Sequence, residues 1–115
     1  GFTTYTGEVT AARQWDGPAE RRWIRPARKD SYEHLFYSSH HDRFFLHLDN
    51  EMAHALNEPL LERAIGVLYR PDSEYASHYF PARLAMQFDA VFHLDETHAV
   101  EPLDSTQLWL EGERL

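Results

Sequence analysis

The apolar and β-branched positions of this chain fall in short clusters that are separated by polar and proline-containing stretches. The first cluster, "FTTYT" at residues 2–6, consists of aromatic and β-branched side chains, which suit a pleated strand surface. Gly7 interrupts it, and the continuation to Ala12 predicts strand, turn and strand. The apolar runs "RFFLHL" (43–48) and "FDAVFHL" (88–94) are strand-sized and predict buried strands.

Helical signals lie between these runs. The stretch "DSYE" predicts a helix with Asp30 as N-cap and an acidic residue three positions later. The stretch "EMAHAL" (51–56) predicts a helix capped by Asn50. The stretch "PLLERA" (59–64) predicts another short helix, with Pro59 in its first turn.

The segment that follows predicts a strand, a loop and a short helix. "AIGVLY" (64–69) predicts a strand in which Gly66 allows close approach of another backbone. "RPDSEYASHYF" (70–80) predicts a loop, and "PARLAMQF" (81–88) predicts one or two helical turns. Strands alternating with short helices predict an α/β fold with a short mixed or partly parallel sheet.

Composition narrows the class of protein. The 115 residues are the size of one domain, and 43% of them are hydrophobic, which predicts a folded chain. There are no cysteines, so disulfides and thiolate metal ligands are excluded; this fits the reducing cytoplasm, where we expect the protein. No apolar run reaches the roughly 18 residues of a membrane helix, so we expect no membrane partner.

The net charge of the chain and one basic stretch both concern possible nucleic-acid binding. The formal net charge of −8 argues against broad nucleic-acid binding. The basic stretch "AERRWIRPARK" (19–29) interleaves Trp23 with arginines, and two interpretations stay open. It forms a nucleic-acid patch, or it is a solvated connector paired with the acidic C-terminal third; we favour the connector.

Eight histidines raise the question of a metal site. His47 and Asp49, like His93 and Asp95, have the i, i+2 spacing that places two side chains on one face of a strand. A zinc site needs three or four ligands, and each pair supplies two. In the alternative, each acid ends its strand and each histidine is a hydrogen-bonded group. We favour this alternative and predict no metal or other cofactor.

The sequence also shows no clear catalytic pair of a nucleophile and a general base. Ser77 precedes His78, but neighbours in sequence do not thereby form a catalytic pair. The sequence contains neither a G-x-S-x-G elbow nor a glycine-rich phosphate loop. The residues alone therefore assemble no complete active site.

Three stretches resemble the erythromycin esterase family. They are "GFTTYTGEVTAARQWDGPAERRWIRPA", "DSYEHLF" and "LERAIGVLYRPDSEYASHYFPARLAMQFDAVFHLDETHAVEPLD". The resemblance covers nearly the whole chain. It implies that residues 1–115 are the C-terminal portion of a longer single-domain α/β enzyme, with no internal domain boundary.

The resemblance also implies a chemistry. Members of this family hydrolyse the lactone ester of macrolides such as erythromycin, using histidine and glutamate to activate water, without an established need for metal. In the family those residues precede the stretch that resembles "GFTTYTG". The resemblance therefore implies no catalytic residue here, no catalytic role for His78 or His93, and an ester or lactone as the substrate of the parent enzyme. The alternative is a stand-alone, non-catalytic binding or interaction domain derived from the family.

Ligands of α/β sheets bind beyond the ends of core strands. Thr4, Tyr5 and Thr6 are therefore the candidates to line a substrate cleft; simple strand packing is the alternative. If the missing part completes the sheet, one sheet face is left under-covered, with Phe2 or Tyr5 exposed. We then expect the chain to self-associate.

Overall fold

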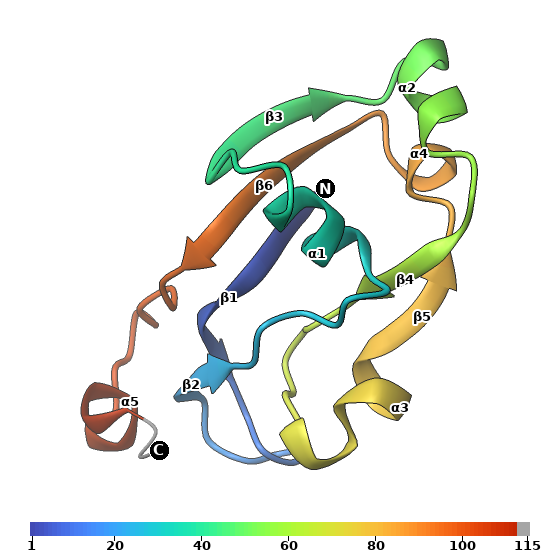
Figure 1. Cartoon of the computed structure of the whole chain (residues 1–115). Coiled ribbons are helices and arrows are strands. Elements are labelled where there is room, and N and C mark those ends of the chain that lie inside the picture. Colours follow the sequence, from blue (N-terminus) through green and yellow to red (C-terminus); the bar gives the residue numbers. More distant parts are fainter. Residues whose placement is uncertain (113–115) are drawn as a thin grey trace.

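A mixed four-stranded sheet and a separate two-stranded sheet organise the computed structural model, which describes residues 1–112 (Figure 1). The larger sheet has the order β2-β1-β6-β3, with β1 parallel to β6 and the two outer strands antiparallel to their neighbours. Its strands are β1 (Phe2–Ala11), β2 (Glu20–Ile24), β3 (Arg43–His47) and β6 (Ala90–Thr97). The smaller sheet pairs β4 (Leu60–Arg63) with β5 (Tyr79–Ala82) in antiparallel fashion. The predicted α/β fold with a mixed sheet is confirmed.

The helices are all short. They are α1 (Tyr32–Tyr37), α2 (Asn50–Ala55), α3 (Glu74–His78), α4 (Leu84–Gln87) and α5 (Gln107–Glu111), with a 3-10 turn η1 (Pro71–Ser73) before α3. Isolated helices of this length are unstable in water, so packing against the rest of the chain must stabilise them. Across residues 1–112, no helix has the length and apolar character needed to cross a membrane.

Strand β1 is one continuous strand, where the sequence predicted two strands joined by a turn. Its first half pairs with β6 up to Gly7, and its second half pairs with β2 from Gly7 onward. Gly7 has a φ of +129°, and a Cβ placed there would lie 2.1 Å from the carbonyl oxygen of Thr97. A glycine is therefore required where β1 changes partners, because the backbone of β6 approaches it closely there.

The main hydrophobic cluster lies between α1 and the sheet. Its buried members are Tyr32, Phe36, Leu48, Ala82, Leu84 and Val91. The hydroxyl of Tyr32 donates a hydrogen bond of 2.9 Å to the carbonyl of Ala82, which links α1 to the small sheet. A second, smaller cluster contains Ala11, Ile24 and Tyr69.

Two helix caps lie one residue away from their predicted positions. Ser31, not Asp30, caps α1, and its hydroxyl accepts a hydrogen bond of 3.2 Å from the backbone N–H of His34. Asp49, not Asn50, caps α2 through an equivalent bond of 2.9 Å. In both helices the cap is the residue whose side-chain oxygen bonds to the third helical N–H. The predicted cap Asp30 lies before that residue, and the predicted cap Asn50 is already the first residue of its helix.

The helix predicted over residues 59–64 is wrong, because this stretch forms β4. Its residues pair with β5 in the register Leu60↔Ala82 to Arg63↔Tyr79. A short apolar run fits a buried strand or a helix equally well, and here pairing with a distant segment decides.

The segment from 64 to 80 also departs from prediction. The strand expected over 64–69 is absent from the structure, which has there only an isolated bridge between Leu68 and Ala12. A Cβ added to Gly66 would meet no atom within 4 Å, so no other backbone approaches this glycine. The loop expected over 70–80 instead contains η1, α3 and the start of β5.

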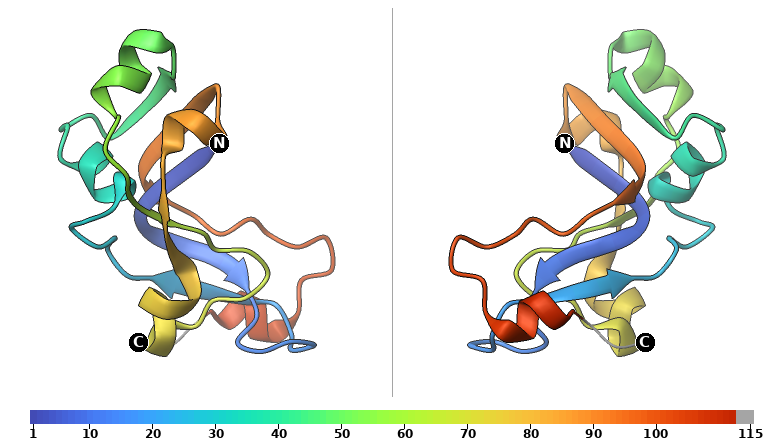
Figure 2. Two further views of the ribbon diagram at one scale, coloured as in Figure 1. Left: turned by 90° about the vertical axis from the view of Figure 1, so that its right-hand side faces the viewer. Right: turned by 90° about the vertical axis from the view of Figure 1, so that its left-hand side faces the viewer.

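The chain is elongated. Its radius of gyration is 15.1 Å, and its principal extents are 48 × 26 × 22 Å. A compact domain of this length has a radius of gyration of about 13 Å. Figure 2 shows α1 on one side of the β1–β6 pair. On the opposite face Phe2 is 80% exposed, which confirms the expected under-covered sheet face.

Candidate functional site

A cleft of about 480 Å³ opens where the parallel part of β1 and strand β6 end. Its lining residues are Tyr5, Thr6, Tyr37, Asp42, Arg43, Leu94, Asp95 and Glu96. The carboxyl ends of parallel strands are where ligands bind in α/β sheets. This cleft is therefore the candidate site.

Two of the three predicted site residues line the cleft, and the third does not. Tyr5 and Thr6 belong to its wall, while the Thr4 hydroxyl donates to the carbonyl of Thr6 at 2.9 Å and lies 3.0 Å from the hydroxyl of Thr97. The Thr6 hydroxyl donates to the carbonyl of Ile24 at 2.9 Å. Both threonine hydroxyls thus hold neighbouring segments together, and the substrate contacts of all three residues stay a prediction.

The Tyr5 ring forms the aromatic part of the wall. It stacks on Tyr37 at the end of α1, with ring centroids 3.8 Å apart and an interplanar angle of 7°. His34 lies against the same pair, with ring centroids 5.9 Å from Tyr5. The stacked pair presents a flat surface suited to the apolar part of a ligand.

The rest of the wall is charged. Asp42, Asp95 and Glu96 provide three carboxylates, and Arg43 provides one guanidinium. The backbone N–H of Asp95 donates to the carbonyl of Asp42 at 2.8 Å, which fixes the turn before β3 against β6. Carboxylates accept hydrogen bonds, so this wall suits hydroxyl or ammonium groups.

A buried histidine holds Asp95. The Nε2 atom of His93 lies 2.8 Å from Oδ1 of Asp95, and its Nδ1 atom lies 2.8 Å from the Thr3 hydroxyl. A carboxylate can only accept, so in the neutral ring Nε2–H donates to Asp95 and Nδ1 accepts from Thr3. The His93 side chain is fully buried between Phe36 and Phe44, with centroids 5.4 and 5.2 Å away. His93 therefore positions Asp95 and does not reach the cleft itself.

Three of the four residues considered as metal ligands have other partners. His93 and Asp95 bond to each other, and Asp49 caps α2. Among residues 1–112, no group of three or more histidine, aspartate or glutamate side chains is arranged to hold a metal ion.

The neighbours Ser77 and His78 also serve the backbone. The Ser77 hydroxyl donates to the carbonyl of Ser73 at 2.7 Å. Nε2 of His78 accepts from the Arg70 N–H at 2.9 Å, and Nδ1 lies 3.0 Å from the carbonyl of Ala64. With both ring nitrogens engaged by backbone groups, the His78 ring is a structural one.

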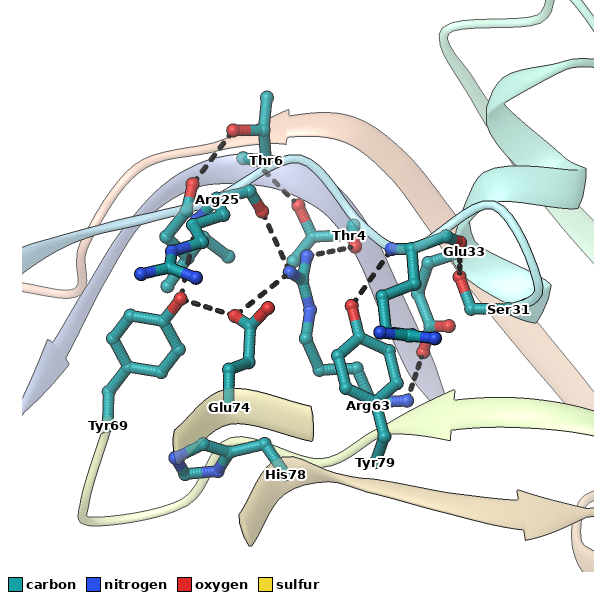
Figure 3. A network of polar contacts seen from close by, with 12 residues as sticks. Thr4, Thr6, Arg25, Ser31, Glu33, Arg63, Tyr69, Glu74, His78 and Tyr79 are labelled. Carbon is teal, nitrogen blue, oxygen red and sulfur yellow. Dashed lines mark hydrogen bonds and ion pairs between the residues drawn. The ribbon is translucent and has the colours of Figure 1, made fainter. Parts of the chain in front are cut away.

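A buried arginine fixes β1 beside the cleft (Figure 3). Arg63 extends from β4, and its guanidinium donates to the carbonyls of Tyr5 at 2.8 Å, Thr4 at 3.3 Å and Arg25 at 2.7 Å. Its Nη1 atom also lies 3.5 Å from Oε2 of Glu74. Only 1% of the Arg63 side chain is exposed. The strand that carries Tyr5 is therefore tied to the small sheet by a buried charge.

Glu74 supplies the opposite charge. It also accepts a hydrogen bond from the Tyr69 hydroxyl, as Figure 3 shows. Burial, together with this bond to a carboxylate, raises the pKa of Tyr69, so the phenol stays protonated and keeps donating. Arg63, Glu74 and Tyr69 thus form one paired and hydrogen-bonded group.

A second buried acid, Glu33, is paired less completely. Its Oε1 atom accepts from the backbone N–H of Arg63 at 2.8 Å, while Oε2 is buried without a hydrogen-bond partner in the described part of the chain. Burial raises the pKa of Glu33, because an ionised carboxylate is poorly solvated there.

Comparison with known proteins agrees with this architecture. A family model described as erythromycin esterase matches residues 1–97. This chain belongs to the erythromycin esterase family. The matched residues run from β1 to the end of β6, so they include the whole four-stranded sheet and every residue of the cleft wall.

Two solved structures of low sequence identity share the fold. One is a succinoglycan biosynthesis protein, with a TM-score of 0.66, 20% identity, and coverage of 86% of this chain and 23% of that protein. The other is a Bacillus cereus protein, with a TM-score of 0.67, 20% identity, and coverage of 86% and 24%. This chain therefore spans about a quarter of the length of the solved structures it matches.

The cleft wall contains residues that sequence reasoning missed. Tyr37, Asp42 and Glu96 lie at or near the ends of elements whose existence was predicted. The sequence signal for these residues was their position at or near the end of a predicted helix or strand. Their convergence depends on the parallel pairing of β1 with β6, which local patterns do not reveal.

Replacing Thr3 by valine should test the His93 arrangement. Thr3→Val keeps the side-chain shape but leaves the buried Nδ1 atom of His93 without its partner, which should cost about 1–3 kcal/mol of unfolding free energy. Urea denaturation measures the loss. Thr3→Ser keeps the hydroxyl and is the matched control. Equal losses in both variants would show that the hydrogen bond does not contribute.

Replacing Glu74 by alanine should strongly destabilise the fold. Glu74→Ala leaves the guanidinium of Arg63 buried without its counter-charge, and such a change costs about 3–5 kcal/mol. Thermal and urea unfolding followed by circular dichroism measure the effect. Asp30→Ala removes the partner of Arg28 in an exposed pair and should change stability little. The expectation fails if both variants lose the same stability.

Replacing Glu33 by glutamine should alter the pH dependence of stability. Because the folded-state pKa of Glu33 lies above its ordinary value of 4.5, the folded state binds this proton more tightly than the unfolded state does. The contribution of Glu33 to stability is thus fully present below that ordinary value and is lost as pH rises through the raised pKa. Glu33→Gln does not titrate, so its melting temperature should exceed that of the wild type by a margin that grows toward neutral pH.

Melting curves between acidic and neutral pH measure that margin. Glu51→Gln, at an exposed site on α2, is the matched control and should follow the wild-type profile. Parallel pH profiles for Glu33→Gln and the wild type would contradict the assignment.

Proposed function

We propose that this chain forms one wall of the substrate cleft of an ester hydrolase of the erythromycin esterase family. The supporting observation is the cleft where the parallel pairing of β1 with β6 ends, inside the family-matched residues. We propose a carboxylic ester or macrolide lactone as the substrate. The catalytic histidine and glutamate would come from the part of the family polypeptide outside this chain.

Ester hydrolysis needs an activated water molecule and stabilisation of the oxyanion that forms on the carbonyl. The two buried imidazoles, His78 and His93, have both ring nitrogens engaged, which supports assigning no general base to either of them. The role proposed for this chain is therefore binding and orientation of the substrate.

The lining residues suit that role. The Tyr5–Tyr37 pair would pack against the apolar skeleton of the substrate. Asp95, Asp42 and Glu96 would accept hydrogen bonds from its hydroxyl or ammonium groups. Because His93 holds one Asp95 oxygen, the other oxygen keeps a defined direction.

A stand-alone binding domain is the second candidate. The hydrophobic cluster around Tyr32 and the Arg63–Glu74 network support it, because residues of this chain form both. The coding sequence distinguishes the two candidates. Continuous coding sequence before Gly1 favours the hydrolase, and a start codon directly before it favours the stand-alone domain.

The hydrolase proposal predicts ligand binding without turnover. Erythromycin added to the isotope-labelled chain should shift the amide signals of Tyr5, Tyr37 and Asp95, and Asp95→Asn should weaken the shifts. Met86→Ser, at an exposed site on α4, is the control and should leave them unchanged. The absence of shifts at the cleft would contradict the proposed substrate.

The same chain should not hydrolyse erythromycin or simple esters, since the proposed catalytic histidine and glutamate lie outside it. Turnover above background that disappears when Asp95 or His93 is replaced would show that this chain carries catalytic residues of its own.

A further inference from the structure

The arginines of the basic stretch at residues 19–29 lie in different places and do not form one continuous strip. The guanidinium of Arg21 lies over the ring of Trp109 on α5, 5.4 Å from its centroid. Arg28 pairs with Asp30 at 3.1 Å. Arg22, next to Arg21 on β2, instead contacts Tyr69, because neighbouring side chains of a strand point to opposite sides. One arginine of the stretch is thus directed to a separate place in the fold.

A cavity of about 270 Å³ lies beside Arg22. Arg13, which follows β1, and Arg70, which precedes η1, also line it, so three separate segments bring arginines together. The other lining residues are Tyr69, Pro71, Asp72 and Ser73. The cavity and the candidate cleft have no lining residue in common. We call it the arginine cavity.

The arginine cavity is positively charged in a chain whose formal net charge is −8. Three arginines and one acidic residue, Asp72, line it. Glu20 lies outside the wall and offsets a further part of the charge, because its Oε2 atom is 3.0 Å from Nε of Arg13. With both acids counted, an excess of positive charge stays at this place.

Arg22 is held in position by the fold. Only 1% of this residue is exposed. Its Nη1 atom donates to the carbonyl of Tyr69 at 2.7 Å, and its guanidinium lies 5.7 Å from the centroid of the Tyr69 ring. An anion beside a buried cation is attracted more strongly than it would be in water, because the local dielectric constant is lower. The buried Arg22 guanidinium therefore favours an anion in the cavity.

Arg70 adds an exposed cation on a fixed backbone. Its backbone N–H donates to Nε2 of His78 at 2.9 Å, which anchors the chain at this point. Within residues 1–112, no hydrogen bond or ion pair engages the Arg70 guanidinium. Its donors are therefore available to a ligand in the cavity.

We propose that the arginine cavity binds a small oxyanion, a phosphate or carboxylate group, through Arg13, Arg22 and Arg70. The planar guanidinium group matches two oxygens of such an anion with a pair of hydrogen bonds. The cavity is smaller than the roughly 300–1,000 Å³ of sites that enclose drug-sized ligands, so it suits a small anion or the anionic end of a larger molecule. This site does not depend on the proposed ester hydrolysis.

Titration of the isotope-labelled chain with inorganic phosphate, and separately with acetate, tests the proposal. With ionic strength held constant by sodium chloride, the side-chain Nε–H signals of Arg22 and Arg70 should shift and saturate. The anion that saturates them at the lower concentration identifies phosphate or carboxylate as the preferred group. These measurements use the wild-type chain, so they are independent of how any variant folds.

Two matched variants locate the binding. Arg70→Gln removes a charge-assisted hydrogen bond and should weaken binding about tenfold. Arg83→Gln removes the same charge at an exposed position outside the cavity and should bind like the wild type.

Three results would overturn the proposal. The first is the absence of saturable shifts at Arg22 and Arg70 with both anions. The second is equal affinity of the Arg70 and Arg83 variants, which would indicate general screening of surface charge. The third is saturation by a single-stranded oligonucleotide with no response to phosphate or acetate, which would instead support a nucleic-acid patch.

Discussion

The buried guanidinium of Arg63 is the group on which the arrangement of the two sheets depends. A charge removed from water is tolerated only when it is paired and hydrogen-bonded. Arg63 meets this condition with the Glu74 carboxylate and with carbonyl oxygens of β1 and of the segment after β2. Its partner Glu74 bonds to Tyr69 of the smaller hydrophobic cluster, and Leu60 on the same strand as Arg63 packs against the main cluster. A polar group thus links two small cores.

Both ends of the cleft are fixed by buried polar groups of this kind. On β1, Arg63 holds the carbonyl of Tyr5, whose ring stacks on Tyr37. On β6, His93 holds the carboxylate of Asp95. Each contact restricts a cleft residue through a side chain that does not itself line the cleft, which is how a binding site keeps its geometry before a ligand arrives. The geometry of the site therefore also depends on residues that do not line the cleft.

Local sequence patterns correctly predicted those helices and strands whose secondary structure does not depend on pairing with a distant segment. The strands near residues 43–48 and 88–94 and the helix after Asp30 have strong local signals, and all three are present. Residues 59–64 have equally strong helical residues, but pairing with β5 makes them a strand. The cleft wall could be predicted only in part, at Tyr5 and Thr6, because it requires the long-range pairing of β1 with β6.

That pairing also couples the two faces of the sheet. Thr3 and His93 point inward, while Phe2 and Phe92 point outward, because side chains alternate along each strand. A slip of β1 by one residue against β6 would turn Phe2 toward α1 and Thr3 outward, and it would separate Thr3 from His93. The register that brings His93 to Thr3 is thus the same register that aligns the exposed rings. The position of Asp95 at the cleft, held by His93, and the alignment of Phe2 with Phe92 on the other face are thus two consequences of one strand pairing.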